Sequence, residues 1–393
     1  MSHEIEFSVM QGSAVGVREL LDQFEAESGI HVRLRLLDWD SAWSDLMKAA
    51  LYSDGPDISE IGTTWLGDLS AMNALYALGE KELAALGRGA NFLPSAWQST
   101  HLVYRTESWA VPWVTGARLI FYRRNLLEKA GVNERLAFQS AAMVNETLKT
   151  LQEKGIRVPW TVPTGTTHTT LHDIASWVWG QRGDFVTADG KRTLFSKPEA
   201  RNGMRAYFSL RRYLAPGVER LNGLEPDAEF INDPEAAVTI TGTWLFNQAA
   251  PKLGKDLGVA LPPGPSFVGG SHLIIWKHST KHQEAFKLIQ FLTQPQAQVQ
   301  HSQSIGLMPA RLDTLISPPF STQPLWQLAA TALRSGRSFP VARSWGLMED
   351  RLTSVFASLW NDILENPDLD LDVALVKRLE PLAQRLDLVL GQS

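Results

Sequence analysis

Hydrophobic and polar positions alternate at the start of the chain and then recur at helical spacing. Glu4–Met10 (EIEFSVM) alternates at period two, which predicts a strand that runs into a loop at residues 11–14. Residues 15–29 space their apolar side chains three and four apart and stop at Gly29, which predicts a helix. The same succession of patterns follows twice more before residue 80, with Ser41 as the expected N-cap of the second helix. Strands alternating with helices in this way indicate βαβ units and a largely parallel sheet.

The rest of the chain is more helical. Helical spacing predicts helices over 136–155, 171–183 and 197–214, the last with Pro198 in its first turn. A strand, a Gly-Thr-Trp turn and a helix are expected within 235–253, and two strand-like pieces surround the Pro/Gly loop that follows. Nearly everything after the second of these pieces is expected to be helical.

Length and charge limit the classes of function. At 393 residues the chain exceeds what one hydrophobic core usually supports, so two lobes are expected. The net charge of −5 is small and Lys and Arg are dispersed, which argues against nucleic acid or a membrane surface as a partner. The absence of cysteine excludes disulfides, thiolate zinc sites and thiol catalysis. The opening MSHEIEFSVM lacks the pattern of an export signal, so the protein is either cytosolic or lacks its native export signal.

Tryptophan is the compositional outlier, with fourteen residues against six tyrosines. About half of them are expected in the core. Four lie in predicted loops beside Gly, Thr or Asp, where core packing is harder to arrange, and these are Trp39, Trp65, Trp113 and Trp244. Aromatic rings in such positions are suited to contact a ligand.

Five segments in order carry a family resemblance: residues 56–75, 111–132, 236–248, 269–293 and 305–311. They include PDISEIGTTW, VPWVTGARLIFYRRN, TITGTWLFNQ, GGSHLIIW and IGLMPAR. Together they resemble the extracellular solute-binding protein family of bacterial ABC importers, in its sugar-binding branch, over nearly the whole chain.

The resemblance implies an α/β, two-lobed periplasmic-binding-protein (Venus-flytrap) fold of the maltose-binding-protein kind. Each lobe would be a mostly parallel sheet flanked by helices, and the C-terminal part would be helical. The N-terminal lobe would hold residues 1–113 plus 271–313, the C-terminal lobe 117–268 plus 318–393, with crossovers near 114–116, 269–270 and 314–317. The ligand would lie in the cleft between lobes, which closes by a hinge motion.

The resemblance also places ligand contacts residue by residue. These expected contacts are Gln11, Gly12, Trp39, Asp40, Thr64, Trp65, Trp113, Gly116, Arg118, His168, Trp244, Gly270, Ser271 and Trp345. Aromatic rings would stack on the C–H face of a sugar, Arg118 would donate to its hydroxyls, and Gly116 would give backbone room. A plain turn at Gln11–Gly12 and a helix cap at Asp40 remain alternatives. Tyr122 is expected in the core, and Glu349 is expected to be a solvated charge.

Other chemistries have weaker sequence support. His168 and His172 share a helix face with Asp173 nearby, yet a metalloprotease motif needs Glu where Thr169 stands, so no metal is expected. A carbohydrate-active enzyme would need two paired carboxylates, and nothing in the sequence pairs the acidic residues. No GxSxG, P-loop or GxGxxG motif occurs. A phosphorylated polyol such as a glycerol phosphate ester is the alternative ligand, and peptide or metal ligands come third.

The resemblance therefore implies a binding protein rather than an enzyme, and no cofactor. Its expected partners are a small-molecule carbohydrate and the membrane permease of an ABC importer, with no nucleic acid. A monomer is expected, in an extracytoplasmic location that is either the periplasm or, through a lipid anchor, the cell surface.

Overall fold

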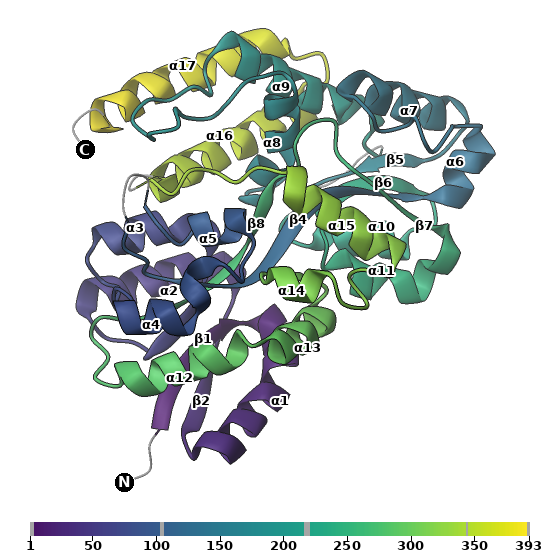
Figure 1. Cartoon of the computed structure of the whole chain (residues 1–393). Coiled ribbons are helices and arrows are strands. Elements are labelled where there is room, and N and C mark those ends of the chain that lie inside the picture. The colour runs from purple at the N-terminus through teal and green to yellow at the C-terminus, as the bar shows by residue number, and fades with distance from the viewer. Residues whose placement is uncertain (1–3, 103–105, 216–220, 343–344, 391–393) are drawn as a thin grey trace. The chain divides into compact units, whose positions relative to one another are not determined.

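The computed structural model describes residues 4–102, 106–215, 221–342 and 345–390, and it divides the chain into two compact units (Figure 1). Each unit is assembled from three stretches of chain. Unit 1 comprises Met1–Gly116, Gly269–Ala330 and Ser338–Gly346, and unit 2 comprises Ala117–Val268, Thr331–Arg337 and Leu347–Ser393. Residues 318–330 belong to unit 1 in this division. The lobe boundaries expected from the sequence stay a prediction.

The sheet of unit 1 combines parallel and antiparallel strands. Its order is β2, β1, β3, β8, and both β2 and β3 run parallel to β1. Strand β8 runs antiparallel to β3, with Ile58 opposite Ile275, and β9 pairs with the first part of β4. The bounds are β1 Glu4–Met10, β2 His31–Leu37, β3 Ile58–Gly62, β4 Val111–Arg123, β8 Val268–Ile275 and β9 Met308–Pro309.

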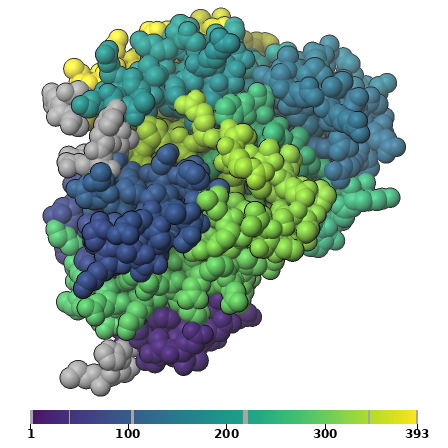
Figure 2. Space-filling model, viewed as in Figure 1, coloured from purple at the N-terminus to yellow at the C-terminus, as the bar shows by residue number. Residues whose placement is uncertain are grey.

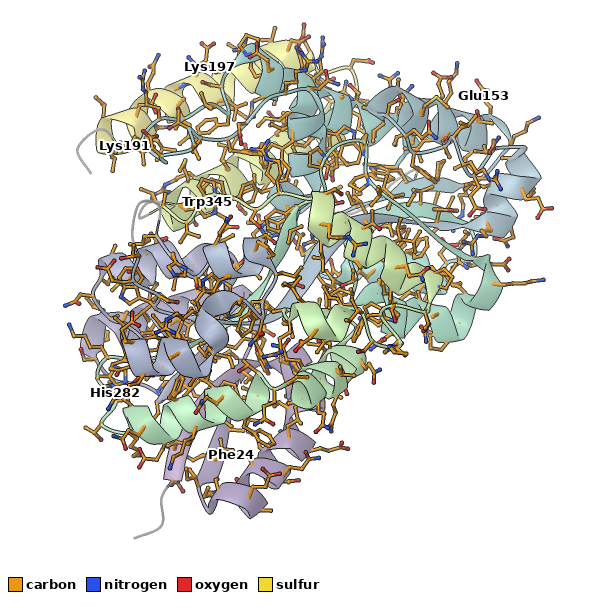
Figure 3. All side chains as sticks on the ribbon, viewed as in Figure 1. Phe24, Glu153, Lys191, Lys197, His282 and Trp345 are labelled. Atoms are coloured by element: carbon orange, nitrogen blue, oxygen red, sulfur yellow. The ribbon has the colours of Figure 1, made fainter. Side chains whose placement is uncertain are left out.

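Helices bury their apolar stripes against this sheet and against one another. In α1 the buried side chains recur at helical spacing, and Phe24 (Figure 3) lies 5.5 Å from the ring of Phe291 in α12. The space-filling view shows α12 and α13, in green, directly beside α1, in purple (Figure 2). The helices are α1 Gln11–Ser28, α2 Trp39–Tyr52, α3 Leu66–Ala71, α4 Glu80–Ala85, α5 Pro94–Gln98, α12 His282–Leu292, α13 Pro295–Ile305 and α14 Leu312–Leu315, with 3₁₀ turns at Thr63–Trp65 and Gly87–Gly89.

The sheet of unit 2 is also mixed. Strand β4 lies between β7 and β6, both antiparallel to it, and β5 is parallel to β6. All seven residues of β6 are buried, as expected for a continuous apolar run inside a sheet covered on both faces. The bounds are β5 Val158–Thr161, β6 Ala236–Gly242 and β7 Leu257–Ala260.

An aromatic core holds the helices of unit 2 together. Trp177 of α8, Tyr207 and Phe208 of α9 and Trp360 of α16 are at most 1 % exposed, and their rings meet edge to face. The helices are α6 Arg124–Ala130, α7 Ala141–Glu153, α8 Thr169–Gly180, α9 Pro198–Phe208, α10 Glu225–Asn232, α11 Leu245–Leu253 and α17 Leu371–Leu390, with 3₁₀ turns at Ser209–Tyr213 and Gly254–Asp256. Helices α15 Pro324–Ser335 and α16 Trp345–Glu365 each begin in unit 1 and end in unit 2.

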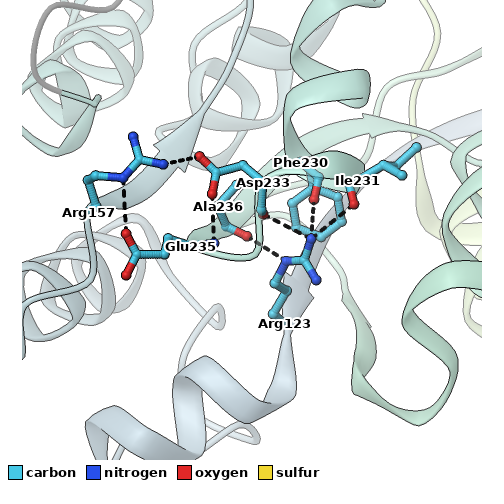
Figure 4. Close-up of polar contacts among 7 residues, drawn as sticks. All are labelled: Arg123, Arg157, Phe230, Ile231, Asp233, Glu235 and Ala236. Carbon is cyan, nitrogen blue, oxygen red and sulfur yellow. Dashed lines mark hydrogen bonds and ion pairs between the residues drawn. The ribbon is translucent and has the colours of Figure 1, made fainter.

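A buried arginine joins the end of α10 to the sheet of unit 2 (Figure 4). Arg123, 7 % exposed at the end of β4, donates from Nη2 to the carbonyl oxygens of Phe230, Ile231 and Asp233 and from Nε to that of Ala236. Because the last carbonyls of a helix have no intrahelical donor, this guanidinium satisfies the C-terminus of α10 and the turn that follows it.

Four expectations about the elements are wrong. The sheets are mixed rather than mostly parallel, because β4, β6 and β8 enter antiparallel pairs. Helix α1 starts at Gln11 with no intervening loop, and α2 starts at Trp39, so Ser41 lies inside the first turn instead of capping it. The helix expected over 136–155 is confined to Ala141–Glu153, with the Ser140 hydroxyl accepting from the amide of Met143 as its N-cap.

Candidate ligand-binding site

A small polar pocket in unit 2 brings two of the expected contact residues together. It is lined by side chains from β4, β6, α8 and α10 and by the residue that precedes α11. Arg118 and Trp244, both expected from the sequence, meet Asp173 and Asp227 there. The remaining lining residues are Pro163, Thr169, Gly223, Leu224, Pro226, Ile240 and Thr241.

Arg118 is held on two sides. It lies opposite Gly242 in the β4–β6 ladder and is 5 % exposed. Its Nε is 3.4 Å from Oδ1 of Asp173, and its guanidinium carbon lies 4.8 Å from the centre of the Trp244 ring. An ion pair and a cation–π contact of this kind both strengthen when water is excluded, so the side chain is fixed in place.

Trp244 is held by a hydrogen bond at the edge of its indole as well as by the contact of Arg118 with its ring face. Its indole Nε1 donates to Oδ2 of Asp227 at 2.7 Å, and the side chain as a whole is half-buried. The ring lies back over the end of β6, where a Cβ on Gly242 would come within 1.9 Å of it. Glycine at position 242 therefore makes room for the indole, and the ring keeps exposed surface in a fixed orientation.

Asp173 is a buried carboxylic acid with few partners. The side chain is fully buried, and although Nε of Arg118 lies 3.4 Å from Oδ1, neither oxygen accepts a hydrogen bond from the described residues. Burial raises the pKa of Asp173 to about 8, against a lowering by Arg118 and with a further rise from Asp227. Burial likewise raises the pKa of Asp227, although the hydrogen bonds from Trp244 and Thr241 lower it. Perturbed carboxyl groups in a pocket are typical of binding sites.

His168, an expected ligand contact, precedes α8, and His172 lies in the first turn of that helix. His168 is half-buried, and its ring centre is 5.2 Å from that of His172. His172 Nε2 lies 3.0 Å from Oε1 of Glu349, and its ring stacks on Phe267 at 4.1 Å. Glu349 is 6 % exposed, so the expectation of a solvated charge there is wrong. Within the described ranges, no group of three or more His, Asp or Glu side chains is arranged to hold a metal ion.

Unit 1 carries an aromatic cluster of three tryptophans. The Trp65 ring lies 5.4 Å from that of Trp39 and 5.6 Å from that of Trp43. Trp39 is 39 % exposed at the start of α2, whereas Trp65 is 8 % exposed and belongs to the core of the unit. Thr64 precedes Trp65 and is half-buried, and the side chain of Asp40 lies outside the described part of the chain.

A buried carboxylate organises the neighbouring strand ends of unit 1. Glu60 of β3 accepts from the backbone amide of Met10 at 2.8 Å and from the hydroxyl of Ser13 at 2.9 Å. Burial raises its pKa, and a hydrogen bond from the side chain of Ser271 lowers it. Ser271, 2 % exposed, is therefore engaged inside the unit, while Gln11 and Gly12 are exposed at the start of α1.

Three other residues that were expected to contact the ligand take part in the internal packing of unit 1. Trp113 is fully buried and stacks on His301 at 4.1 Å, so its expected place at a cleft wall is wrong. Trp345 (Figure 3) is 1 % exposed and stacks on Phe339 at 4.3 Å. Gly270 has a φ of 143°, and a Cβ there would lie 2.1 Å from the Val114 oxygen. Gly116 is the last residue of the first stretch of unit 1 and is half-buried.

Two residues that build these sites were not expected from the sequence. Asp227 lies in the first turn of α10, where an acidic residue is usually explained by the helix dipole. Glu60 is the one charged residue of the buried strand ISEIG, and a carboxylate at a buried position of a strand is a signal that could have been used. Tyr122, at 2 % exposure, is a core residue as expected.

Comparison with known proteins agrees with this architecture. The model of the bacterial extracellular solute-binding protein family matches residues 19–327. The diacetylchitobiose binding protein DasA of Streptomyces coelicolor is 22 % identical over 356 residues, covering 87 % of this chain and 81 % of the relative.

Solved structures share the fold over essentially the whole chain. An ABC transporter solute-binding protein from Thermotoga lettingae, bound with alpha-D-tagatose, superposes with a TM-score of 0.87 at 20 % identity, covering 99 % of this chain and 100 % of the other. UgpB from Mycobacterium tuberculosis, in complex with glycerophosphocholine, gives a TM-score of 0.80 at 19 % identity, covering 99 % and 98 %. With the family model matching most of its length, this chain belongs to the bacterial extracellular solute-binding protein family, and its fold is that of the two-lobed periplasmic binding proteins.

Proposed function

We propose that this chain is the substrate-binding component of a carbohydrate ABC importer and that its ligand stacks on Trp244. Membership of the solute-binding family supports a binding role, and the relative named for diacetylchitobiose and the neighbour bound to tagatose support a sugar. The protein would act outside the cytoplasmic membrane, deliver its ligand to a membrane permease and carry out no catalysis.

The fixed indole of Trp244 is the observation that carries the proposal. Asp227 holds its edge and Arg118 lies over its ring, so the ring does not have to be ordered when the ligand arrives. Aromatic contacts contribute about 1 kcal/mol beyond area burial. The nearby hydroxyl of Thr241 and the carboxyl group of Asp173 offer hydrogen bonds to sugar hydroxyls.

Apart from the buried Trp113, the other expected contacts stay predictions. They include the exposed residues Gln11, Gly12 and Trp39, and the half-buried His168. Hinge closure on the ligand likewise stays a prediction, and such closure would follow from any ligand that binds the closed state more tightly than the open one.

A thermal-shift panel of mono- and oligosaccharides, followed by titration of tryptophan fluorescence, tests the proposal. Trp244→Ala should weaken binding of any panel sugar at least about tenfold while the fold is retained. Trp97→Ala is the matched control, because Trp97 is also half-buried but stacks on Phe92 in unit 1. Equal affinity of wild type and Trp244→Ala would remove Trp244 from the site, and a panel without any binding sugar would refute the carbohydrate proposal.

A glycerol phosphate ester is the second candidate ligand. The neighbour solved with glycerophosphocholine favours it. Such a ligand needs cationic or N–H donors that converge on its phosphate, and Arg118 is the pocket residue that could supply them. Titration with glycerol 3-phosphate in the same assay separates this candidate from a sugar.

A further inference from the structure

The dipeptide Asn–Gly occurs twice in the sequence, and the structure gives the two copies different backbones. Asn202–Gly203 lies inside α9, whereas Asn222–Gly223 lies in the turn just before α10. Both asparagines are exposed, so access of water does not distinguish them. Asparagine is one of the chemically labile residues of proteins, and any difference in reactivity between these two has to come from their backbones.

The backbone of the first copy is locked. The amide of Gly203, inside α9, donates to the carbonyl oxygen four residues earlier, as α-helical geometry requires. A Cβ on Gly203 would lie 2.5 Å from Cα of Val178, so α9 packs closely against α8 at this point. The nitrogen of Gly203 is therefore held away from the side chain of Asn202.

The backbone of the second copy leaves the glycine nitrogen available. Within the parts of the chain that the structure describes, the amide of Gly223 donates no hydrogen bond. Gly223 has a φ of 49°, and a Cβ there would have no neighbour within 4 Å. The segment is a turn, in which the carbonyl oxygen of Asn222 accepts from the amide of Glu225 at 2.9 Å. A following residue without a side chain gives its nitrogen the least hindered approach to the asparagine amide.

The side chain of Asn222 carries a donor on the oxygen that matters for this reaction. Its Oδ1 accepts a hydrogen bond from the backbone amide of Thr166 at 3.1 Å. Negative charge develops on this oxygen when a nucleophile adds to Cγ. A backbone N–H directed at the oxygen stabilises that charge.

We propose that Asn222 is a site of spontaneous deamidation, at which the backbone nitrogen of Gly223 displaces the side-chain nitrogen. The Gly223 nitrogen gives up its proton and forms a bond to Cγ of Asn222. The bond between Cγ and Nδ2 then breaks, and Nδ2 leaves as ammonia with the proton that balances the one lost. One water molecule opens the resulting succinimide at either of its carbonyl carbons, which gives aspartate or isoaspartate.

The products change the rim of the pocket in unit 2. Gly223 and Leu224 line this pocket together with Trp244. Both products add a negative charge beside Glu225, whose Oε2 accepts from the amide of Asn222 at 2.6 Å. Isoaspartate also routes the main chain through Cγ and so lengthens it by one carbon directly before the two lining residues.

Incubation of the whole protein in alkaline buffer, followed by pepsin digestion in acid and mass spectrometry, tests the inference. The peptide that contains Asn222 should gain the mass difference between an amide and a carboxylic acid and separate into an aspartate and an isoaspartate form. Asn202 is the internal control and should keep its amide in the same sample. In protein incubated in denaturant both asparagines should convert at comparable rates, because the helix that protects Asn202 is gone.

Gly223→Ala is the matched variant. Its Cβ has room in the fold but hinders ring closure, so conversion at Asn222 should be strongly slowed. An intact Asn222 amide in the folded wild type, or conversion of Asn202 as fast as that of Asn222, would overturn the inference. Equal conversion in wild type and in a cooperatively melting Gly223→Ala would also overturn it. If this variant does not fold, the comparison of the two asparagines in wild type decides alone.

Discussion

Arg123 offers a test of how much one buried side chain contributes to unit 2. Its guanidinium donates to four carbonyl oxygens around the end of α10, at distances from 2.7 to 3.2 Å, and no carboxylate takes part in these bonds (Figure 4). Arg123→Met keeps the apolar stem but leaves these acceptors without their donor. Two donating nitrogens are lost, and hydrogen bonds from charged groups contribute about 1.5–3 kcal/mol each, so we expect a loss of about 3–6 kcal/mol.

Arg157 provides the matched control. It pairs with Asp233 and Glu235 in the same corner of unit 2, but its side chain is 55 % exposed. Exposed ion pairs contribute little to stability because water screens them, so Arg157→Met should destabilise the protein far less than Arg123→Met.

Urea unfolding followed by circular dichroism measures both variants. Since about 1 kcal/mol shifts the melting temperature of a unit of this size by roughly 2–4 °C, Arg123→Met should also melt about 6–24 °C lower. If the two variants lose the same stability, within about 1 kcal/mol, the reasoning that burial of the donor decides the cost is refuted.

Three further predictions follow from other residues. Gly270→Ala should lower the free energy of unfolding by about 2–4 kcal/mol in urea, because its φ of 143° is strained for alanine and the new Cβ would lie 2.1 Å from the Val114 oxygen; an unchanged midpoint would contradict this. Asp227→Ala should weaken sugar binding about fivefold in the fluorescence titration, because the indole of Trp244 loses its acceptor, and unchanged affinity would show that this bond does not position the ring. Folded Asp173 keeps its proton to about pH 8 whereas the unfolded residue loses it near 3.8, so the unfolded state binds fewer protons between these values and stability falls as pH rises through them. In Asp173→Asn the free energy of unfolding should decrease less steeply with pH, by up to about 1 kcal/mol per pH unit between pH 6.5 and 8. If the free energies of unfolding of wild type and variant change in parallel with pH, the raised pKa of Asp173 is contradicted.

Local patterns predicted most elements because burial follows the same periodicity that the sequence displays. Strand β1 has the expected bounds, Glu4–Met10, and α9 begins at Pro198 as expected. Patterns failed where a distant residue decides the local structure. The start of α1 resembles a turn in sequence, yet Glu60, fifty positions away, accepts from Met10 and Ser13 and so stabilises a helix there.

The candidate site was predictable in part for a similar reason. Arg118 and Trp244 follow from the family resemblance and do lie together, but their partner Asp227 comes from a different helix, and no spacing in the sequence reveals that contact. For Trp113 the sequence predicted a ligand contact that the structure does not support, because the ring is buried. A glycine and a threonine nearby suggested an exposed ring, whereas its stacking on His301 depends on α13, nearly two hundred residues later.

The interleaved order of the two units has a consequence for biosynthesis. Unit 1 takes its last residues from Ser338–Gly346, and unit 2 takes its last from the stretch that follows. Neither unit is therefore complete until the ribosome has passed residue 338, and until the later strands are made β3 lacks its partner β8 and β4 lacks its partner β9. Chaperones that hold the nascent chain would thus be needed for longer than in a protein whose domains follow one another along the sequence.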